Sequence, residues 1–136
     1  MRPQPAATPR PTRSGPGRVL VTVYGIFALA ATARSVMQII VDFQSAPLAY
    51  LLSAFSGLVY IVATLSLARG DAASRRIAYV AISTEAVGVL TVGTLSFAVP
   101  SLFAHPTVWT GYGSGYGFVP LVLPFIGLWW LRRTGR

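Results

Sequence analysis

The chain has 136 residues, of which 54% are hydrophobic and only 10% are charged. About a quarter of the residues in an ordinary soluble domain are charged, so this composition is typical of a membrane protein. The absence of cysteine excludes disulfides and thiolate chemistry. The net charge of +8 comes from arginines that lie mostly at the ends of apolar segments, which indicates membrane topology and argues against nucleic-acid binding.

Residues 1–17 form a tail that contains five prolines and three arginines and has no apolar periodicity. Such a segment cannot bury a core, so we expect it to be a disordered Pro/Arg-rich cytoplasmic tail, or to extend over a partner. The basic front and small-x-small sites that follow also suit a cleaved signal peptide. The apolar run continues to Val41, however, and this full span favours a retained helix.

Residues 18–136 contain four apolar segments, at about 19–43, 47–68, 77–99 and 109–131. Each segment can supply the about 20 helical residues that cross the hydrocarbon core of a membrane. The linkers are short, so neighbouring helices should run antiparallel. The predicted fold is therefore all-α: a polytopic membrane protein with an antiparallel four-transmembrane-helix bundle.

Ten of the eleven arginines fall on one side of this four-span arrangement. They precede the first helix, separate the second from the third, and follow the fourth, whereas the two opposite loops contain none. Cytoplasmic loops carry an excess of basic residues. We therefore predict a multi-pass protein of the cell (plasma) membrane with both termini in the cytoplasm.

The fourth segment begins with TGYGSGYGF, residues 110–118, which holds two Gly-Tyr-Gly triplets. Potassium-channel filters share this triplet, but the filter valine is missing here and Pro106 leaves no room for a pore helix. We interpret the segment instead as a kinked, tightly packed helix with an irregular outer turn, because glycines four residues apart let helices approach closely and prolines loosen a helix. The predicted helix-packing glycines are Gly57, Gly88, Gly111, Gly113, Gly115 and Gly117.

Ionisable residues within membrane spans are costly and usually face the protein interior, so they are the main functional candidates. Arg34 lies about 22 Å along the first helix and Glu85 about 12 Å along the third, and the arginine side chain leans toward the cytoplasm. We predict an Arg34–Glu85 pair, direct or water-bridged, and regard Asp42 as a poorer partner because it lies about 12 Å from Arg34. The pair would hold two helices together, or Glu85 would bind a proton or cation as transporter carboxylates do.

Polar residues also follow one face of each of the first three helices. Lipid cannot satisfy such groups, so we expect these stripes to meet in the bundle core. Their members are Gln38 and Asp42, then Ser53, Ser56, Tyr60 and Thr64, then Thr84 and Thr91.

The sequence indicates neither an enzyme nor a cofactor. It has no Ser/His/Asp set, phosphate-binding loop or pair of catalytic carboxylates, and one histidine with one aspartate is too few for a convincing metal site. We interpret His105 instead as part of an outer surface for a partner. The other members of that surface are Trp109, Tyr112 and Tyr116.

Three stretches carry a family resemblance: PLAYLLSAFSGLVYIVATLSLARG, RRIAYVAISTEAVGVLTVGTLSF and TVWTGYGSGYGFVPLVLPFIGLWWLRR. They resemble small four-span actinobacterial integral membrane proteins over residues 19–133. The resemblance implies a cell-membrane location and four spans but no activity. Small multidrug transporters are a weaker comparison, because their essential glutamate lies in the first helix and dual topology needs a weak arginine bias.

The leading hypothesis is a non-enzymatic accessory or assembly subunit of a larger membrane complex. Its partners would be the lipid bilayer and other membrane subunits or further copies of the chain. One alternative is a small transporter or channel-like oligomer that uses Glu85. The other is a lipid-binding membrane protein with a groove beside the kinked fourth helix.

Overall fold

The computed structural model describes residues 15–45, 47–103 and 107–134, and these residues form helices and turns without a strand. The four long helices are α1 (Pro16–Asp42), α2 (Pro47–Arg69), α3 (Ala72–Ala98) and α4 (Val119–Thr134). Three short 3-10 helices join them: η1 (Phe43–Ser45), η2 (Pro100–Phe103) and η3 (Thr110–Tyr116). The predicted all-α fold is confirmed.

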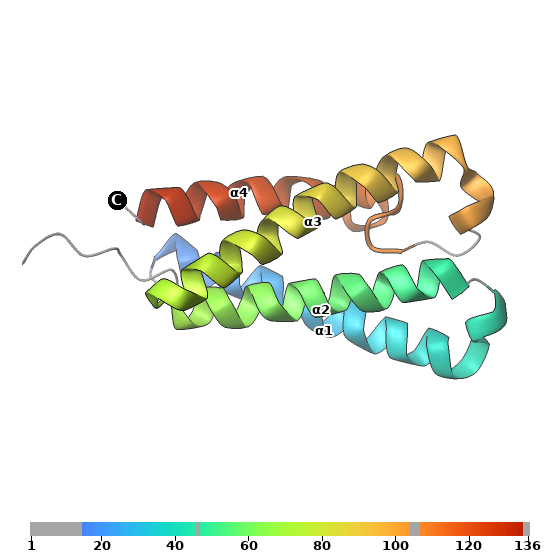
Figure 1. Ribbon diagram of the computed structural model, residues 1–136, viewed down its shortest axis with the longest axis horizontal. Helices are drawn as coiled ribbons and strands as arrows, with labels where there is room; N and C mark the ends of the chain where they lie inside the picture. Colours follow the sequence, from blue (N-terminus) through green and yellow to red (C-terminus); the bar gives the residue numbers. More distant parts are fainter. Residues whose placement is uncertain (1–14, 46, 104–106, 135–136) are drawn as a thin grey trace, which may run out of the picture.

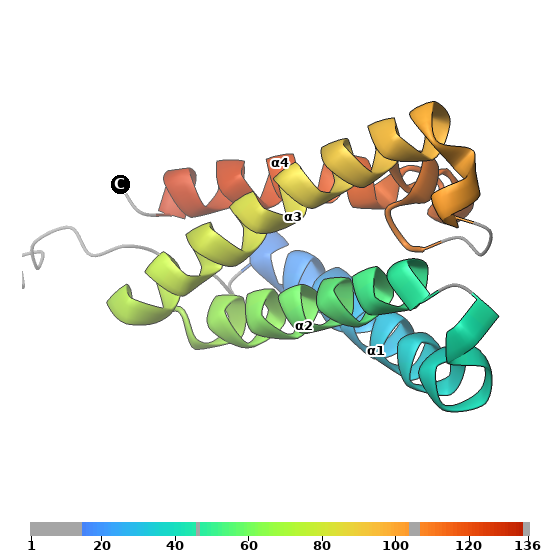
Figure 2. The same ribbon diagram turned by 45° about the vertical axis from the view of Figure 1, so that its right-hand side comes forward.

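The long helices lie side by side along the length of the molecule (Figure 1). Turning the molecule shows α3 between α2 and α4, with α1 packed against α2 (Figure 2). The start of α1, the α2–α3 turn and the end of α4 lie at one end of the bundle (Figure 1). The arginines that flank the helices therefore gather at this end, which we call the basic end.

Three helices, α1, α2 and α3, are each long and apolar enough to cross a membrane, with mean hydropathies of 1.7, 2.0 and 1.5. A fourth span exists only if η3 and α4 are taken together, and these two helices are bent by 97° at the break between them. The fold thus contains three to four candidate membrane spans.

Local signals explain where the helices begin. Pro16 starts α1 in the first turn, where a missing backbone N–H costs nothing. The tail predicted over residues 1–17 is therefore two residues too long, and its first fourteen residues lie outside the described ranges. Asp71 caps α3 by accepting a hydrogen bond from the backbone N–H of Ser74 at 2.8 Å, so α3 starts before the predicted position 77.

The predicted fourth helix is wrong in its first half. Gly111, Tyr112 and Gly113 have φ values of 61°, 60° and 81°, and Gly117 has a φ of 65°. Residues in this left-handed region cannot continue a right-handed helix. As a result, α4 begins only at Val119 and is about 24 Å long.

Because α4 is short, η3 lies inside the bundle, beside the C-terminal half of α3. The backbone N–H of Gly111 donates to Ser96 Oγ at 2.9 Å, and the hydroxyls of Tyr112 and Thr94 lie 2.9 Å apart. Irregular backbone at membrane depth is tolerated only where protein or a water-filled cavity surrounds it. Here, α3 supplies that protein surface.

Candidate functional site

Four buried side chains form a polar cluster in the middle of the bundle, which we call the core polar cluster: Tyr24, Tyr60, Glu85 and Trp109. The hydroxyl of Tyr24 donates to Glu85 Oε1 at 2.6 Å, and Trp109 Nε1 donates to the hydroxyl of Tyr60 at 3.0 Å. The Tyr24 and Tyr60 rings lie 6.1 Å apart between their centres. None of the four side chains is more than 1% exposed.

Helices α1, α2 and α3 each supply one member of the cluster from their buried faces, and α4 covers it. Tyr24 lies on the face of α1 that also buries Leu20 and Ala28, at helical spacing. Glu85 follows Ile82 on the buried face of α3. On α4, a Cβ built on Gly127 would lie 3.1 Å from the Tyr24 hydroxyl, so the glycine lets α4 close over the cluster.

Glu85 is the unusual member of the cluster. Within the part of the chain that the structure describes, Oε2 of this carboxylate has no hydrogen-bond partner and no arginine forms an ion pair with it. Glu85 is the central residue of α3, which is long and apolar enough to cross a membrane. An ionised carboxylate without a counter-charge is costly there, so the site favours uptake of positive charge.

The direct form of the predicted Arg34–Glu85 pair is wrong. Arg34 Nη1 donates to the hydroxyl of Tyr116 at 2.8 Å, and Glu85 accepts from Tyr24 instead. Arg34 lies ten residues beyond Tyr24, about 15 Å farther along α1. Phe27 lies between these two positions on α1, and its ring centre is 5.8 Å from that of Tyr116, the partner of Arg34.

The predicted polar stripes reach the core only in part. Ser53, Ser56 and Tyr60 of α2 are buried. Thr64 and Thr84 are half-buried, and each hydroxyl donates to a carbonyl oxygen four residues earlier, at 2.6 and 2.7 Å. A threonine can thus satisfy its hydroxyl within its own helix, so lipid does not force it into the core.

The remaining stripe members lie outside the core. Thr91 is exposed on α3, and Gln38 is half-buried on α1. Asp42 is exposed at the end of α1, where the hydroxyl of Tyr50 donates to it at 3.4 Å. The expectation that all three stripes meet in the core is therefore wrong for these residues.

The predicted packing glycines divide into two groups. Gly57 lies at the contact between α1 and α2, where an added Cβ would come within 3.0 Å of Thr32 Oγ1. Gly88 faces the Trp109 ring and not a helix backbone. The prediction is wrong for the other four, which lie in or next to η3: Gly111, Gly113 and Gly117 have positive φ, and Gly115 has open space around it.

The predicted outer partner surface is also wrong for its three aromatic residues. Trp109 is 1% exposed, and the half-buried Tyr112 and Tyr116 hydrogen-bond to Thr94 and Arg34. These rings therefore fill the outer part of the bundle. His105 lies outside the described residues.

Sequence reasoning missed four residues that the structure places in internal contacts: Tyr24, Arg75, Gly93 and Gly127. The small residues Ala28, Ala31 and Ser35 that follow Tyr24 at helical spacing were a signal for the buried face of α1. Nothing in the sequence pattern predicts an internal contact for Arg75, because it is one of the flanking arginines that indicate topology. Its guanidinium is buried, and Nη2 donates to the carbonyl oxygen of Leu131 and to Thr134 Oγ1 at the end of α4.

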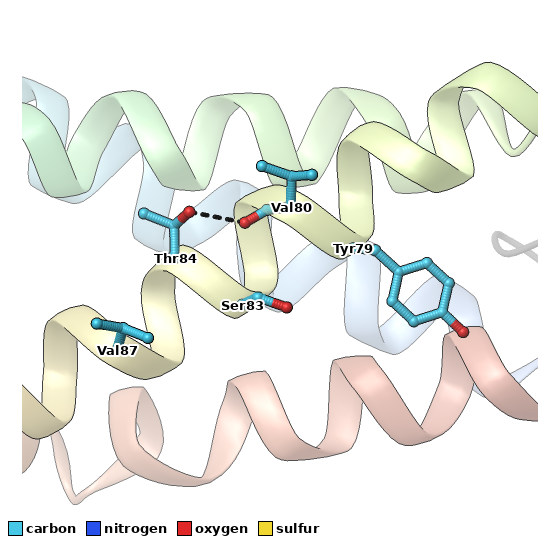
Figure 3. Close-up of a pocket in the computed structure, with 5 residues that line it drawn as sticks. All are labelled: Tyr79, Val80, Ser83, Thr84 and Val87. Atoms are coloured by element: carbon cyan, nitrogen blue, oxygen red, sulfur yellow. Dashed lines mark hydrogen bonds between the residues drawn. The ribbon is translucent and has the colours of Figure 1, made fainter.

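Several depressions mark the outside of the bundle. One of about 550 Å³ lies between α1 and α4, where a groove was predicted beside the fourth helix. A second, about 410 Å³, lies between α2 and α3. The third, about 480 Å³, lies on α3 itself (Figure 3). Their linings include no member of the core polar cluster.

Within residues 15–45, 47–103 and 107–134, no three His, Cys, Asp or Glu side chains come together as a metal site. Comparison with protein-family models, curated proteins and solved structures finds no match to this chain. The resemblance to small four-span actinobacterial proteins therefore stays a prediction. What is shown is a helical protein with three to four helices able to cross a membrane.

Proposed function

We propose that this chain is a small, non-enzymatic transporter of the cell membrane, in which Glu85 takes up and releases a proton during the transport cycle. The observation that carries this proposal is the buried carboxylate whose Oε2 has no partner within the described residues. The accessory-subunit hypothesis relied partly on an outer aromatic surface, and those aromatic side chains are used inside the bundle.

The surroundings of Glu85 favour a proton over a metal cation. Hard divalent cations require six or more oxygen ligands, at least some of them from water or carboxylates. Only the Tyr24 hydroxyl hydrogen-bonds to Glu85 in the described part of the chain, and the nearby Tyr60 hydroxyl already accepts from Trp109. A proton needs no further ligand and removes the charge that burial disfavours.

Proton exchange requires the cluster to open, and α4 is the helix best suited to move. Its buried face carries Pro120, Pro124 and Gly127. Pro124, inside the helix, lacks the N–H that would tie successive turns together, and glycine is a poor helix former. A bend of α4 near these residues would uncover the Tyr24 hydroxyl, which Gly127 faces.

The arginine distribution supports an orientation with the basic end in the cytoplasm. Arg69 and Arg75 at the α2–α3 turn and Arg132 and Arg133 at the end of α4 belong to this end. Basic residues are retained on the cytoplasmic side of a membrane. Both termini would then be cytoplasmic.

The test is proton uptake by the purified chain in liposomes that enclose a pH-sensitive dye, with an imposed potential. We expect Glu85→Gln to abolish uptake, because glutamine keeps the hydrogen bond from Tyr24 but cannot release a proton. Asp42→Asn is the matched control, since it makes the same change in an exposed carboxylate and should leave uptake intact. Uptake by Glu85→Gln at the wild-type rate would refute the proposal.

A second measurement reports proton binding without transport. Infrared difference spectra of the wild type during a pH change should contain a carboxylic C=O band that is missing in Glu85→Gln and present in Asp42→Asn. In Tyr24→Phe the band should shift, because the carboxyl loses its hydrogen bond. A spectrum of Glu85→Gln identical to that of the wild type would contradict proton exchange at this residue.

A second candidate function, as a subunit of a larger assembly, is favoured by the outer face of α3. Ser83 lies in the depression on this face, and its hydroxyl has no hydrogen bond to the described residues (Figure 3). The hydroxyl of Thr84 donates to the carbonyl oxygen of Val80, and the ring of Tyr79 points away from Ser83. An unsatisfied hydroxyl facing hydrocarbon favours contact with a polar group of another membrane helix.

Cross-linking distinguishes this second candidate, because the chain has no natural cysteine. Ser83→Cys should cross-link to a second copy or to a co-purifying subunit in native membranes. Leu29→Cys is the control, since Leu29 is 74% exposed on α1, away from this face. Absence of any Ser83→Cys product, with a chain that always elutes alone in mild detergent, would exclude the assembly role.

A further inference from the structure

The groove between α2 and α3 has apolar walls and one charged residue. Phe55, Leu58 and Val62 of α2 and Ile77 and Val80 of α3 line it, and its volume is about 410 Å³. Four of these five side chains are exposed by more than 40%, so the groove opens sideways to the surroundings of the bundle. In a membrane it would face the acyl chains of lipids.

The charge lies at one end of this groove. Arg76 lines it near the α2–α3 turn, and Thr84 lines it about 12 Å farther along α3. The Thr84 hydroxyl donates to Val80 O at 2.7 Å, so the far end offers no unsatisfied polar group. A single cation followed by an apolar channel matches the form of a phospholipid, which has a phosphate at one end and acyl chains beyond it.

The guanidinium of Arg76 is available to an anion. It is exposed, and within the described residues it makes neither an ion pair nor a hydrogen bond. The one carboxylate at this turn, Asp71, is engaged by the Ser74 backbone N–H and by Arg69 at 3.6 Å. Arg75 is turned into the bundle toward Thr134, so it does not compete. Guanidinium groups bind phosphate oxygens with two parallel hydrogen bonds.

We propose that the α2–α3 groove binds an anionic phospholipid, with one acyl chain along the groove and its phosphate held by Arg76 at the basic end of the bundle. The groove between α1 and α4 is larger, but its lining carries no charged residue. That second groove would accept any acyl chain and select no headgroup. The charge at position 76 is what makes the α2–α3 site specific.

The experiment uses the full chain in detergent with two lipids of identical acyl chains, phosphatidylglycerol and phosphatidylcholine. Native mass spectrometry and thermal unfolding should both show tighter binding of phosphatidylglycerol. Arg76→Gln should weaken that binding at least about fivefold, as expected for one basic residue at an anionic surface. Arg69→Gln, the matched control at the same turn, should bind close to wild type.

Further variants and probes make the result decisive. Val80→Trp fills the groove and should weaken both lipids, and Arg76→Lys should restore most of the headgroup preference if Arg76→Gln fails to fold. Equal binding of the two lipids by the wild type, or unchanged binding by Arg76→Gln or Val80→Trp, would overturn the proposal. So would full stabilisation by inorganic phosphate alone. Failure of proton uptake at Glu85 would leave these results unaffected, because neither Arg76 nor Val80 contacts the core polar cluster.

Discussion

The indole of Trp109 lies against Gly88: a Cβ built on that glycine would be only 2.5 Å from Trp109 Cζ3. The same indole donates to the hydroxyl of Tyr60 at 3.0 Å. A residue that precedes η3 is thus fixed between α2 and α3, and this contact holds the irregular segment inside the bundle. Tyr112 repeats the arrangement five residues farther along α3, against Gly93.

Replacing Gly88 by alanine should therefore destabilise the fold. The new methyl group would overlap a ring that has no room to move, and overpacking of this kind typically costs about 1–3 kcal/mol. Gly115→Ala is the control, because no atom lies within 4 Å of its Cβ position. Equilibrium unfolding in mixed micelles measures both variants. A Gly88→Ala protein as stable as Gly115→Ala would contradict the placement of Trp109.

Arg75 should be more important for stability than its neighbour Arg76. Arg75 binds the last turn of α4 through Leu131 O and Thr134 Oγ1, and hydrogen bonds from charged groups contribute about 1.5–3 kcal/mol. Arg75→Met should lower the free energy of unfolding by about this amount. Arg76→Met, in detergent without anionic lipid, should change it by less than about 0.5 kcal/mol. Equal effects of the two substitutions would show that Arg75 does not hold α4.

Mutant cycles can distinguish the Arg34–Tyr116 hydrogen bond from the Arg34–Glu85 pair that the sequence predicted. A double-mutant cycle with Arg34→Met and Tyr116→Phe should give a coupling of about 1.5–3 kcal/mol, the size of a hydrogen bond from a charged group. Arg34→Met and Glu85→Gln should be additive within about 0.5 kcal/mol, because the two side chains do not touch. A large Arg34–Glu85 coupling would restore the ion pair.

Asp71 should make stability depend on pH in the acidic range. Hydrogen bonding from Ser74, chiefly from its backbone N–H, lowers the pKa of Asp71, and the nearby Arg69 has a smaller effect. A carboxyl with a lowered pKa stabilises the fold fully above the pKa of the unfolded chain, and this stabilisation is lost as the pH falls through the folded value.

The corresponding measurement compares Tm across pH. Asp71→Ala should have a lower Tm than the wild type at neutral pH, because the α3 cap is lost, and the difference should shrink in acid. Asp71→Asn keeps a neutral acceptor and should resemble the acidified wild type. A wild-type-to-Ala difference that stays constant with pH would mean that the carboxylate is not the cap.

The sequence by itself determined the helical class, the approximate extents of the first three helices and the basic end. These properties depend on local composition: long apolar runs, proline at a helix start and arginines between the runs. Long apolar runs are suited to lipid and arginines to the aqueous side of a membrane, so composition alone is enough to predict these properties. The turn between Arg69 and Ala72 is an example, since it needs no partner from elsewhere in the chain.

The tertiary structure alone decided which polar groups meet. Arg34 and Glu85 have suitable charges, but in the folded chain Arg34 donates to Tyr116 and Glu85 accepts from Tyr24. The path of residues 109–118 was likewise undecided by spacing, because Gly-x-Gly patterns suit both close helix packing and left-handed turns. The left-handed turn is favoured because the Trp109 and Tyr112 rings pack against Gly88 and Gly93 of α3. That packing joins residues far apart in the chain.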